Sequence, residues 1–393
     1  KHPIFIEIGI KRNPPLKTNL TPFNVIIIGG GLAGLSSAIH LSKEGISVLL
    51  IEKNAYPLHK VCGEYISNEV LPYLQYLEID VFALGAQKIN KLELSSAKGQ
   101  RVKATLPLGG FGISRYTLDR DLSEKALQNG VKIIQDLVID IQFSDDIFSV
   151  QTKNEVFQSK VVIGAYGKRA SLDVKTNRSF STQKSPFMAV KMHVNGDFPN
   201  DLVALHHFKG GYCGVSKVEN NTVNLCYITN LNAFKPYKDI ERFQEEVVYK
   251  NIYLKTIFTN SQAVFETPLT ISQISFAKKS PVENHIMMCG DTAGMIHPLC
   301  GNGMSMAIRS AYMASDLIIK YLQGDIHSRM ELEKAYEKSW NLEFKNRLRM
   351  GHFTANVFSK NQLSERLFPI VRQFPRLLAK IVTLTHGKPM IVK

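Results

Sequence analysis

The chain has 393 residues, of which 44% are hydrophobic and 21% are charged, an ordinary globular composition that excludes global disorder and a single small core. Its formal net charge of +14 lies mostly at the ends: residues 1–22 carry +3 and residues 341–393 carry +8, which leaves a nearly neutral body. A neutral body argues against a domain built to bind nucleic acid, so we expect no nucleic-acid partner.

The first predicted element is an arm over residues 1–22. A buried strand (24–28), a helix (32–43) and a second strand (47–51) then form a βαβ unit of the size expected for a parallel crossover. Residues 18–42 are uncharged and long enough to span a bilayer, but their clustered glycines and serines favour a strand, a tight turn and a helix. We expect neither a transmembrane helix nor a signal peptide.

The rest of the chain alternates between strand and helix patterns. We expect extended segments over 86–110, a helix over 118–128 and strands at 131–134, 147–151 and 160–164. Alternating and aromatic segments predict a mostly antiparallel sheet with strands at 188–194, 202–208, 223–229 and 271–276. A buried strand at 285–289 precedes helices at 303–322, 331–350 and 362–385, the last divided by Pro369 and Pro375.

A glycine cluster, Gly29-Gly30-Gly31-Leu32-Ala33-Gly34, joins the first strand to its helix and has the form G-x-G-x-x-G. In this motif Gly29 permits the tight turn, Gly31 lets the backbone approach a pyrophosphate, and Gly34 lets helix and strand pack closely. Glu52 ends the second strand, near the spacing of about 20 residues expected for an acid that binds ribose hydroxyls. The pattern predicts a dinucleotide site rather than a plain turn, but it does not separate FAD from NAD.

A second glycine-rich region follows the strand at 285–289. The strand runs into Gly290-Asp291-Thr292-Ala293-Gly294, and Gly301-Asn302-Gly303-Met304 opens the next helix. An acid directly after a strand suits ribityl hydroxyls, and a helix N-terminus stabilises negative charge on a reduced isoalloxazine. Both features favour the long cofactor FAD over a plain turn and helix cap.

With these motifs the chain resembles the FAD-dependent oxidoreductases of the p-hydroxybenzoate hydroxylase fold, and most of all the geranylgeranyl reductase group. The resemblance covers roughly residues 23–350 and includes Cys62-Gly63-Glu64, Arg115 with Leu118-Asp119, and Gly164 to Arg169. It implies that Arg115 leads the helix beside FAD. It also implies that Cys62 lies near the flavin, where a thiol tunes the ring or supplies a proton. A surface arginine and a buried free cysteine are the alternatives.

Two departures from the family pattern concern the reaction. Where the superfamily has G-A-D-G-x-x-S, Tyr166 replaces the acid, which puts direct use of NADPH in question. The Y-x-W-x-F-P signature of the reductases is absent, and residues 206–212 stand in the corresponding region, so the substrate does not carry over. His206 and His207 are adjacent on a predicted strand, so at most one of them faces the flavin, and a surface pair is the alternative. The W-x-W-x-I-P signature of flavin halogenases is also missing.

The expected fold is α/β: a Rossmann-like FAD-binding domain with an inserted, mostly antiparallel substrate domain and a helical C-terminal tail. We expect the FAD-binding domain to be discontinuous over 23–85, 111–174 and 281–325. The substrate domain would then cover 86–110 and 175–280, and the basic tail 326–393.

The tail has an amphipathic pattern. Val371, Phe374, Leu378 and Ile381 share one helical stripe, and Arg372, Arg376 and Lys380 share another. Such a helix suits anionic headgroups at the inner face of a membrane, and a helix packed on the body is the alternative. Five cysteines without a C-x-x-C pair or a metal-ligand set favour a cytoplasmic location and no metal site.

We expect an FAD-dependent oxidoreductase that reduces alkene bonds of an isoprenoid or polyketide-type lipid. NADPH or NADH would act as a transient reductant, or an electron-donor protein would replace it. A flavin monooxygenase acting on an aromatic or polyketide substrate and a non-catalytic lipid escort are the alternatives. Cys62 is the candidate catalytic residue. The candidate FAD-binding residues are Gly29, Gly31, Leu32, Ala33, Gly34, Glu52, Lys53, Cys62, Arg115, Asp291, Gly301, Asn302, Gly303 and Met304.

Overall fold

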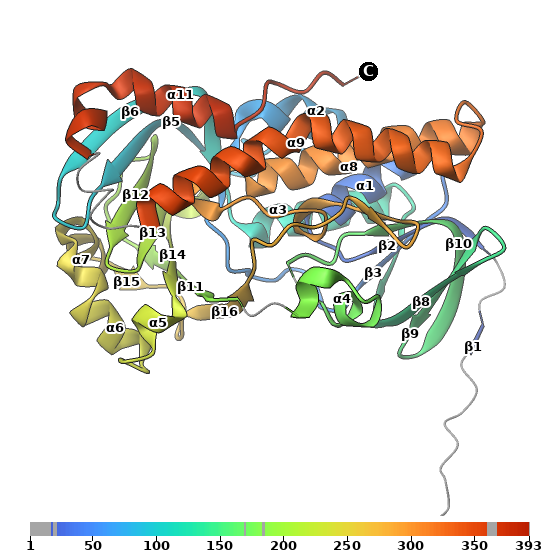
Figure 1. Ribbon diagram of the computed structural model, residues 1–393, viewed down its shortest axis with the longest axis horizontal. Coiled ribbons are helices and arrows are strands. Elements are labelled where there is room, and N and C mark those ends of the chain that lie inside the picture. Colours follow the sequence, from blue (N-terminus) through green and yellow to red (C-terminus); the bar gives the residue numbers. More distant parts are fainter. Residues whose placement is uncertain (1–16, 19–21, 169, 183–184, 360–367, 393) are drawn as a thin grey trace, which may run out of the picture.

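The computed structural model describes residues 17–18, 22–168, 170–182, 185–359 and 368–392. These residues form two nine-stranded sheets, with long helices lying across the first sheet and onto the second (Figure 1). The predicted N-terminal arm lies outside the described residues, apart from residue 22 and β1 (Lys17–Thr18), which pairs with β10 (Glu155–Gly164). The α/β fold class is confirmed, and the domain boundaries given above stay predictions.

The first sheet is built around the predicted βαβ unit. β2 (Phe23–Ile28) and β3 (Val48–Glu52) pair in parallel, and α1 (Leu32–Lys43) connects them as predicted. The strand order is β17-β18-β10-β2-β3-β7, and β8 and β9 pair beside β10. The other strands are β7 (Lys132–Gln135), β8 (Val138–Ser144), β9 (Ile147–Thr152), β17 (Val282–Glu283) and β18 (Ile286–Met288). The central strands are buried apolar runs, as expected for a parallel sheet covered on both faces.

Helices α3 (Arg115–Gln128), α8 (Gly303–Gln323) and α9 (Arg329–Ser359) accompany α1 on this sheet, as Figure 1 shows. α3 begins three residues before the predicted start, because Ser114 caps it by accepting a hydrogen bond from the backbone N–H of Thr117. α2 (Leu71–Tyr76) and α4 (Ser171–Lys175) are short. Short 3₁₀ turns occur at Asn68–Val70, Ser179–Thr182, Glu219–Asn221, Val248–Lys250, Gly290–Thr292 and Pro298–Cys300.

The second sheet has the order β15-β11-β14-β13-β12-β5-β6-β4, with β16 beside β11. Every pair in it is antiparallel except β5 with β12, which confirms the predicted mostly antiparallel sheet. Its strands are β4 (Tyr65–Ser67), β5 (Gln87–Ser95), β6 (Arg101–Gly112), β11 (Phe187–Asn195), β12 (Leu202–Phe208), β13 (Gly211–Lys217), β14 (Thr222–Asn230), β15 (Gln262–Ala263) and β16 (Leu269–Ile274).

Two of the longer strands escaped the sequence analysis. β13 was missed because its opening glycines look like a turn, and Gly210 (φ +88°) does make the turn that precedes it. β8 was also missed, since it carries no continuous apolar run. One face of the second sheet packs on α5 (Leu231–Phe234), α6 (Ile240–Glu246) and α7 (Ile252–Thr259) through buried residues such as Phe243 and Leu254. The other face of the second sheet carries none of these helices and faces the first sheet.

The C-terminal tail is divided as its prolines predict. α9 continues nine residues beyond the predicted end, to Ser359. Residues 368–373 are helical, the helix breaks at Phe374, and α11 (Pro375–Thr385) begins with proline at its first position. α11 lies on β6 and beside α9 (Figure 1). Among the described residues, no helix combines the length and the apolar character needed to cross a bilayer.

Candidate functional site

A cavity of about 690 Å³ lies where the two sheets meet. Its walls come from the carboxyl ends of β2, β3 and β10, the N-termini of α1 and α8, the inner face of the second sheet, and α11. Of the candidate FAD-binding residues, all but two line this one cavity. They are Gly29, Gly31, Leu32, Ala33, Glu52, Lys53, Cys62, Arg115, Asp291, Gly301, Gly303 and Met304.

The glycine loop has the geometry that its sequence requires. Gly29 has a φ of +101°, and a Cβ placed there would lie 2.4 Å from the Ala165 carbonyl oxygen. A Cβ on Gly34 would lie 1.9 Å from the Gly29 oxygen, so Gly34 permits close packing and does not itself line the cavity. A Cβ on Gly31 would meet only the Arg115 guanidinium within 4 Å, at 3.6 Å. The backbone at Gly31 thus opens onto the cavity, which fits a pyrophosphate group.

Glu52 lies at the end of β3, beside the glycine loop. Its carboxylate accepts hydrogen bonds from the backbone N–H of Gly30 (2.7 Å) and of Asn54 (3.0 Å). The Tyr56 hydroxyl donates to the Gly30 carbonyl at 2.7 Å, which fixes the loop from the other side. The Asn54 side-chain amide also donates to the Glu52 carboxylate, at 3.1 Å. A carboxylate has about four acceptor positions, so Glu52 keeps about one of them for the ribose.

Arg115 is not a surface arginine, because its side chain is mostly buried and contacts Asp119 in a bidentate pair with both N–O distances at 2.8 Å. Lys60 donates to the same carboxylate at 2.8 Å. Burial alone would raise the pKa of Asp119, but the charges of Arg115 and Lys60 hold it below its usual value. Two cations against one anion leave net positive charge beside Gly31, which suits a phosphate.

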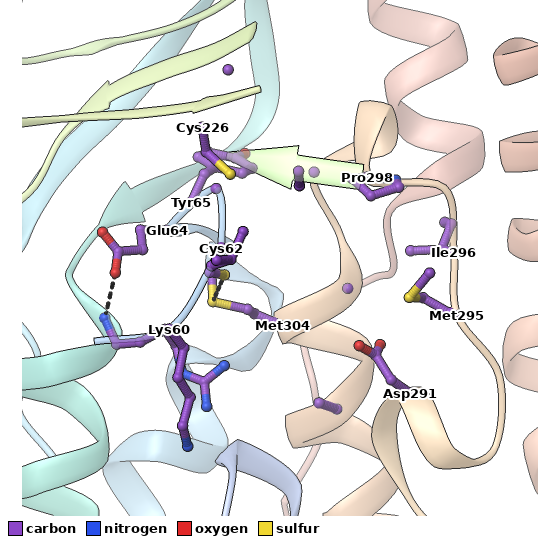
Figure 2. Close-up of a pocket in the computed structure, with 18 of the residues that line it drawn as sticks. Lys60, Cys62, Glu64, Tyr65, Cys226, Asp291, Met295, Ile296, Pro298 and Met304 are labelled. Carbon is purple, nitrogen blue, oxygen red and sulfur yellow. Dashed lines mark hydrogen bonds between the residues drawn. The ribbon is translucent and has the colours of Figure 1, made fainter. Parts of the chain in front are cut away.

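The second glycine-rich region forms the opposite wall. Asp291 faces the cavity from the turn after β18, and Figure 2 shows it across from Met304. Lys279 holds this turn in place by donating to the backbone oxygens of Asp291 and Lys168, each at 2.7 Å. Burial lowers the pKa of Lys279 to about 8. Nothing in the sequence singled out Lys279, because it is one of two adjacent lysines outside any motif.

Asn302 is the second candidate that does not line the cavity. Its side-chain amide donates instead to the backbone oxygen of Thr385 at 2.8 Å, which connects the start of α8 to the end of α11. The sequence could not reveal this contact, because the two residues are far apart in the chain. The Asn302 side chain thus makes a structural contact, and a contact of Asn302 with FAD stays a prediction.

Cys62 lies in the cavity wall with its thiol 3.4 Å from the Met304 sulfur, as Figure 2 shows. The Asn224 amide donates to the Cys62 carbonyl at 3.2 Å and so ties this loop to β14. Cys226, two residues further along β14, lines the same cavity. Burial raises the pKa of Cys226 to about 12, so it stays a neutral thiol.

Glu64, two residues after Cys62, is the centre of a buried ionic cluster. It has a φ of +53°, accepts from the backbone N–H of Arg115 at 2.8 Å and from the His193 imidazole at 2.7 Å, and forms an ion pair with Lys191. Burial alone would raise the pKa of Glu64, but the hydrogen bond from His193 and the charge of Lys191 hold it below its usual value. The sequence analysis missed both partners, because a polar residue in a strand gives no sign of what it faces.

Tyr166 lines the cavity at the position where the superfamily has an acid. Its hydroxyl lies 3.6 Å from the Met288 sulfur. Nearby, the buried Arg178 binds Asp173 at 3.0 Å and Glu283 at 2.7 Å, and donates to the Thr292 backbone oxygen at 3.0 Å. An ionic cluster that the sequence did not predict thus supports the Asp291 turn from behind.

The histidine pair on β12 fits neither sequence-based alternative. His206 and His207 are both buried, so they do not form a surface pair. Neither lines the cavity, so neither faces a ligand there. His206 instead pairs with Ser95 at 2.8 Å and stacks on Tyr253, within the β5–β12 side of the sheet. The adjacent side chains point to opposite faces as expected, but both faces are covered.

The half of the cavity beyond Cys62 is apolar. β5, β6 and β12 contribute Leu92, Leu94, Leu106, Val203 and Leu205 to it. α11 covers this region, since Leu378, Ile381, Val382 and Thr385 line it as well. We call this region the apolar arm. It offers space for a hydrocarbon chain and few polar partners.

Sequence comparison agrees with the cofactor geometry. Residues 22–340 match the model of the FAD binding domain family. The chain is 26% identical over 339 residues to digeranylgeranylglycerophospholipid reductase 1 of Methanosphaera stadtmanae, covering 82% of this chain and 81% of that protein. It is 22% identical to a 1H-pyrrole-2-carbonyl-[peptidyl-carrier protein] brominase of Pseudoalteromonas luteoviolacea, covering 77% and 79%.

Solved structures share the fold. A geranylgeranyl bacteriochlorophyll reductase-like protein from Thermoplasma acidophilum superposes with a TM-score of 0.74 at 17% identity, covering 94% of this chain and 97% of that one. A flavin-dependent brominase superposes with a TM-score of 0.75 at 19% identity, covering 93% of each chain. Since the family model matches most of the chain and the glycine-lined cavity fits its cofactor, this protein belongs to the FAD binding domain family.

Proposed function

We propose that this FAD-dependent oxidoreductase reduces carbon–carbon double bonds in an isoprenoid or polyketide-type lipid. One observation carries the proposal: a single cavity joins the glycine-lined half, which fits FAD, to an apolar arm that fits a hydrocarbon chain. The sequence relatives that are named digeranylgeranylglycerophospholipid reductases support the same class of substrate.

In this proposal Gly29, Gly31, Glu52, Arg115 and Asp291 hold the cofactor. Gly31 and Arg115 bind the pyrophosphate, Glu52 the ribose hydroxyls and Asp291 the ribityl hydroxyls. Leu32, Ala33 and Lys53 contact the same half of the cofactor, and Gly301, Gly303 and Met304 lie at the flavin end. FAD, when bound and reduced, supplies a hydride to one alkene carbon.

Cys62 supplies the proton to the other alkene carbon. Its S–H points toward the Met304 sulfur within the cavity, so the proton is held at the wall of the apolar half. The thiolate left behind regains a proton from water, which balances the reaction. The buried walls of the apolar arm exclude water from the rest of the substrate's hydrocarbon chain.

A flavin monooxygenase is the second candidate. A monooxygenase needs no nucleophilic side chain, and the relative named as a brominase supports a reaction other than reduction within related chains. A lipid escort without redox chemistry is disfavoured, because Gly29, Gly31 and Gly34 keep the geometry of a cofactor loop. Reduction by NADPH or NADH, or by an electron-donor protein, fits either enzyme.

The deciding experiment is anaerobic. The photoreduced holoenzyme is mixed with digeranylgeranylglycerophospholipid in neutral detergent, and flavin reoxidation and product mass are recorded. Reoxidation with a lipid that has gained two hydrogens per bond supports the reductase. A lipid that reacts only when oxygen is admitted, and gains oxygen, supports the monooxygenase. Purified protein that cannot bind FAD supports the escort. Anaerobic bleaching of the flavin band by NADPH or NADH identifies the reductant, and failure of both indicates a protein donor.

We also place the enzyme at the cytoplasmic face of an anionic membrane. Residues 341–393 carry a formal charge of +8 while the body is nearly neutral. A basic end on a neutral body favours association with anionic headgroups, and a lipid substrate is available there. Co-sedimentation with anionic vesicles tests this location.

A further inference from the structure

Residues 368–385, which we call the C-terminal strap, cross the β5–β6 end of the second sheet (Figure 1). The inner side of the strap is apolar and packed: Leu378 is only 5% exposed and lies in one cluster with Leu94 and Leu106. Ile381 and Val382 line the apolar arm beside it. The strap is therefore the layer that separates the apolar arm from the outside.

The outer side of the strap carries large exposed apolar side chains. Phe374 is 56% exposed, Leu377 43% and Leu384 46%. Leu377 and Leu384 are seven residues apart on α11, so they lie on one side of the helix, two turns apart. No described part of the chain covers them, although burying such residues is favourable.

Basic side chains share this outer side. Arg372, Arg376 and Lys380 are exposed, and Arg376, Lys380 and Leu384 follow one another at helical spacing. Residues 368–392 contain no aspartate or glutamate that could neutralise them. An apolar stripe bordered by unneutralised basic residues is typical of a helix that lies in the interface of an anionic bilayer. A second copy of the strap is a poor partner, because two such faces repel each other.

Contacts at the end of the strap and just beyond it hold the strap in this orientation. The Asn302 amide donates to the Thr385 backbone oxygen at 2.8 Å, and the Met390 N–H donates to the Glu69 backbone oxygen at 2.9 Å. Arg309 binds the Lys388 backbone oxygen and the buried Glu69 carboxylate. The outer face is therefore presented by a fixed element rather than by a loose tail.

We propose that the outer face of the C-terminal strap docks on an anionic bilayer, which places the apolar arm one helix away from the membrane. The docking rests on the exposed face alone. The further idea that substrate enters the apolar arm from the bilayer rests on the proposed function, because only a lipid substrate would be dissolved in the membrane.

A tryptophan reporter tests the docking directly. The chain has one tryptophan, Trp340, which is 5% exposed, so a new surface tryptophan dominates quenching by an added agent. Leu377→Trp and, as the matched control, Leu127→Trp on the exposed side of α3 are mixed with phosphatidylglycerol vesicles that carry brominated acyl chains. We expect strong quenching of Leu377→Trp and little of Leu127→Trp. Equal quenching of both, or none at position 377, overturns the proposal.

Charge reversal tests the basic side. Each basic residue near an anionic surface strengthens binding about fivefold, so Arg376→Glu with Lys380→Glu is expected to weaken vesicle binding at least about tenfold. Lys153→Glu with Lys160→Glu, at exposed positions of the β9–β10 hairpin, changes the net charge equally and is expected to have a small effect. Equal losses in both pairs would mean a general charge effect and overturn the proposal.

Two further outcomes separate this proposal from the proposed function. If Leu377→Trp is shielded without vesicles and sedimentation shows a dimer, the face binds a second copy and the proposal fails. If vesicle binding follows the prediction while the anaerobic assay shows no lipid reduction, the docking stands and the proposed reaction fails. Vesicle binding and sedimentation do not depend on turnover, whereas the anaerobic assay measures it, so the two ideas can fail independently.

Discussion

Lys191 and Glu64 form an ion pair in which neither side chain is exposed to solvent. Lys191 belongs to β11 of the second sheet, and Glu64 follows the Cys62 loop, which connects the first sheet to β4. The pair therefore fixes the position of the Cys62 loop relative to the inner face of the second sheet. With the His193–Glu64 and Asn224–Cys62 hydrogen bonds, it joins the two walls of the cavity beside the candidate catalytic thiol.

This pair should be strongly coupled. Lys191→Met leaves the Glu64 carboxylate buried without its cation, which we expect to destabilise the protein by about 3–5 kcal/mol. Adding Glu64→Gln removes that charge, so the double variant should be more stable than the sum of the single changes predicts. Denaturant unfolding of the unmodified protein, the two single variants and the double variant measures the coupling free energy. Strictly additive losses would show that the pair does not act as a unit.

Substitutions at two glycines of the motif at the start of α1 should have different effects. Gly31→Ala places a methyl group where only the Arg115 guanidinium is near, so the protein should fold with near-normal thermal stability but bind FAD at least about tenfold more weakly. Gly34→Ala places the methyl group 1.9 Å from the Gly29 oxygen and should destabilise the protein even without FAD. FAD titration and melting of the apo-protein separate the two effects. Normal FAD affinity in Gly31→Ala would contradict our placement of the pyrophosphate.

If Cys62 donates the proton, replacing it should slow lipid reduction without affecting FAD binding. Cys62→Ser should keep FAD and its reduction, but slow lipid reduction about a hundredfold, since a serine hydroxyl is a much weaker acid than a thiol. Cys226→Ser is the matched control, because Cys226 lines the same cavity and stays a neutral thiol. Single-turnover reoxidation by lipid is the measurement. Similar rates for the two serine variants would remove Cys62 from its proposed role.

His206 predicts how stability depends on pH. Burial lowers its pKa to about 3, whereas an unfolded chain has a histidine pKa of about 6.5. As the pH falls below 6.5, His206 binds a proton in the unfolded state but stays neutral in the folded state. The free energy of unfolding therefore decreases. The part of this decrease that comes from His206 should reach about 2 kcal/mol near pH 5, and the buried His40, His207 and His297 add to it. His206→Gln should make this part of the profile less steep by that amount, while His327→Gln, at an exposed position, serves as the control variant. A profile unaltered by His206→Gln would contradict the assignment.

The sequence by itself determined the cofactor half of this protein. The βαβ unit and the glycine motif are local: the residues that make the turn, the helix start and the acid at the strand end lie within one short stretch. α1 accordingly has the predicted bounds, and Gly29, Gly31 and Glu52 line one cavity. The family match extends beyond this stretch, over residues 22–340.

Only the tertiary structure decided what surrounds this half. Lys191 and Glu64 meet across the two sheets, Asn302 contacts Thr385 instead of the cavity, and both histidines of β12 are buried. In the tail, the strap packs Leu378 inward and leaves Phe374 outside, although the pattern put both on one stripe, because the helix breaks between them. Such contacts join residues that are far apart in the chain. Their energies depend on packing and burial in the folded protein, which a local sequence pattern cannot predict.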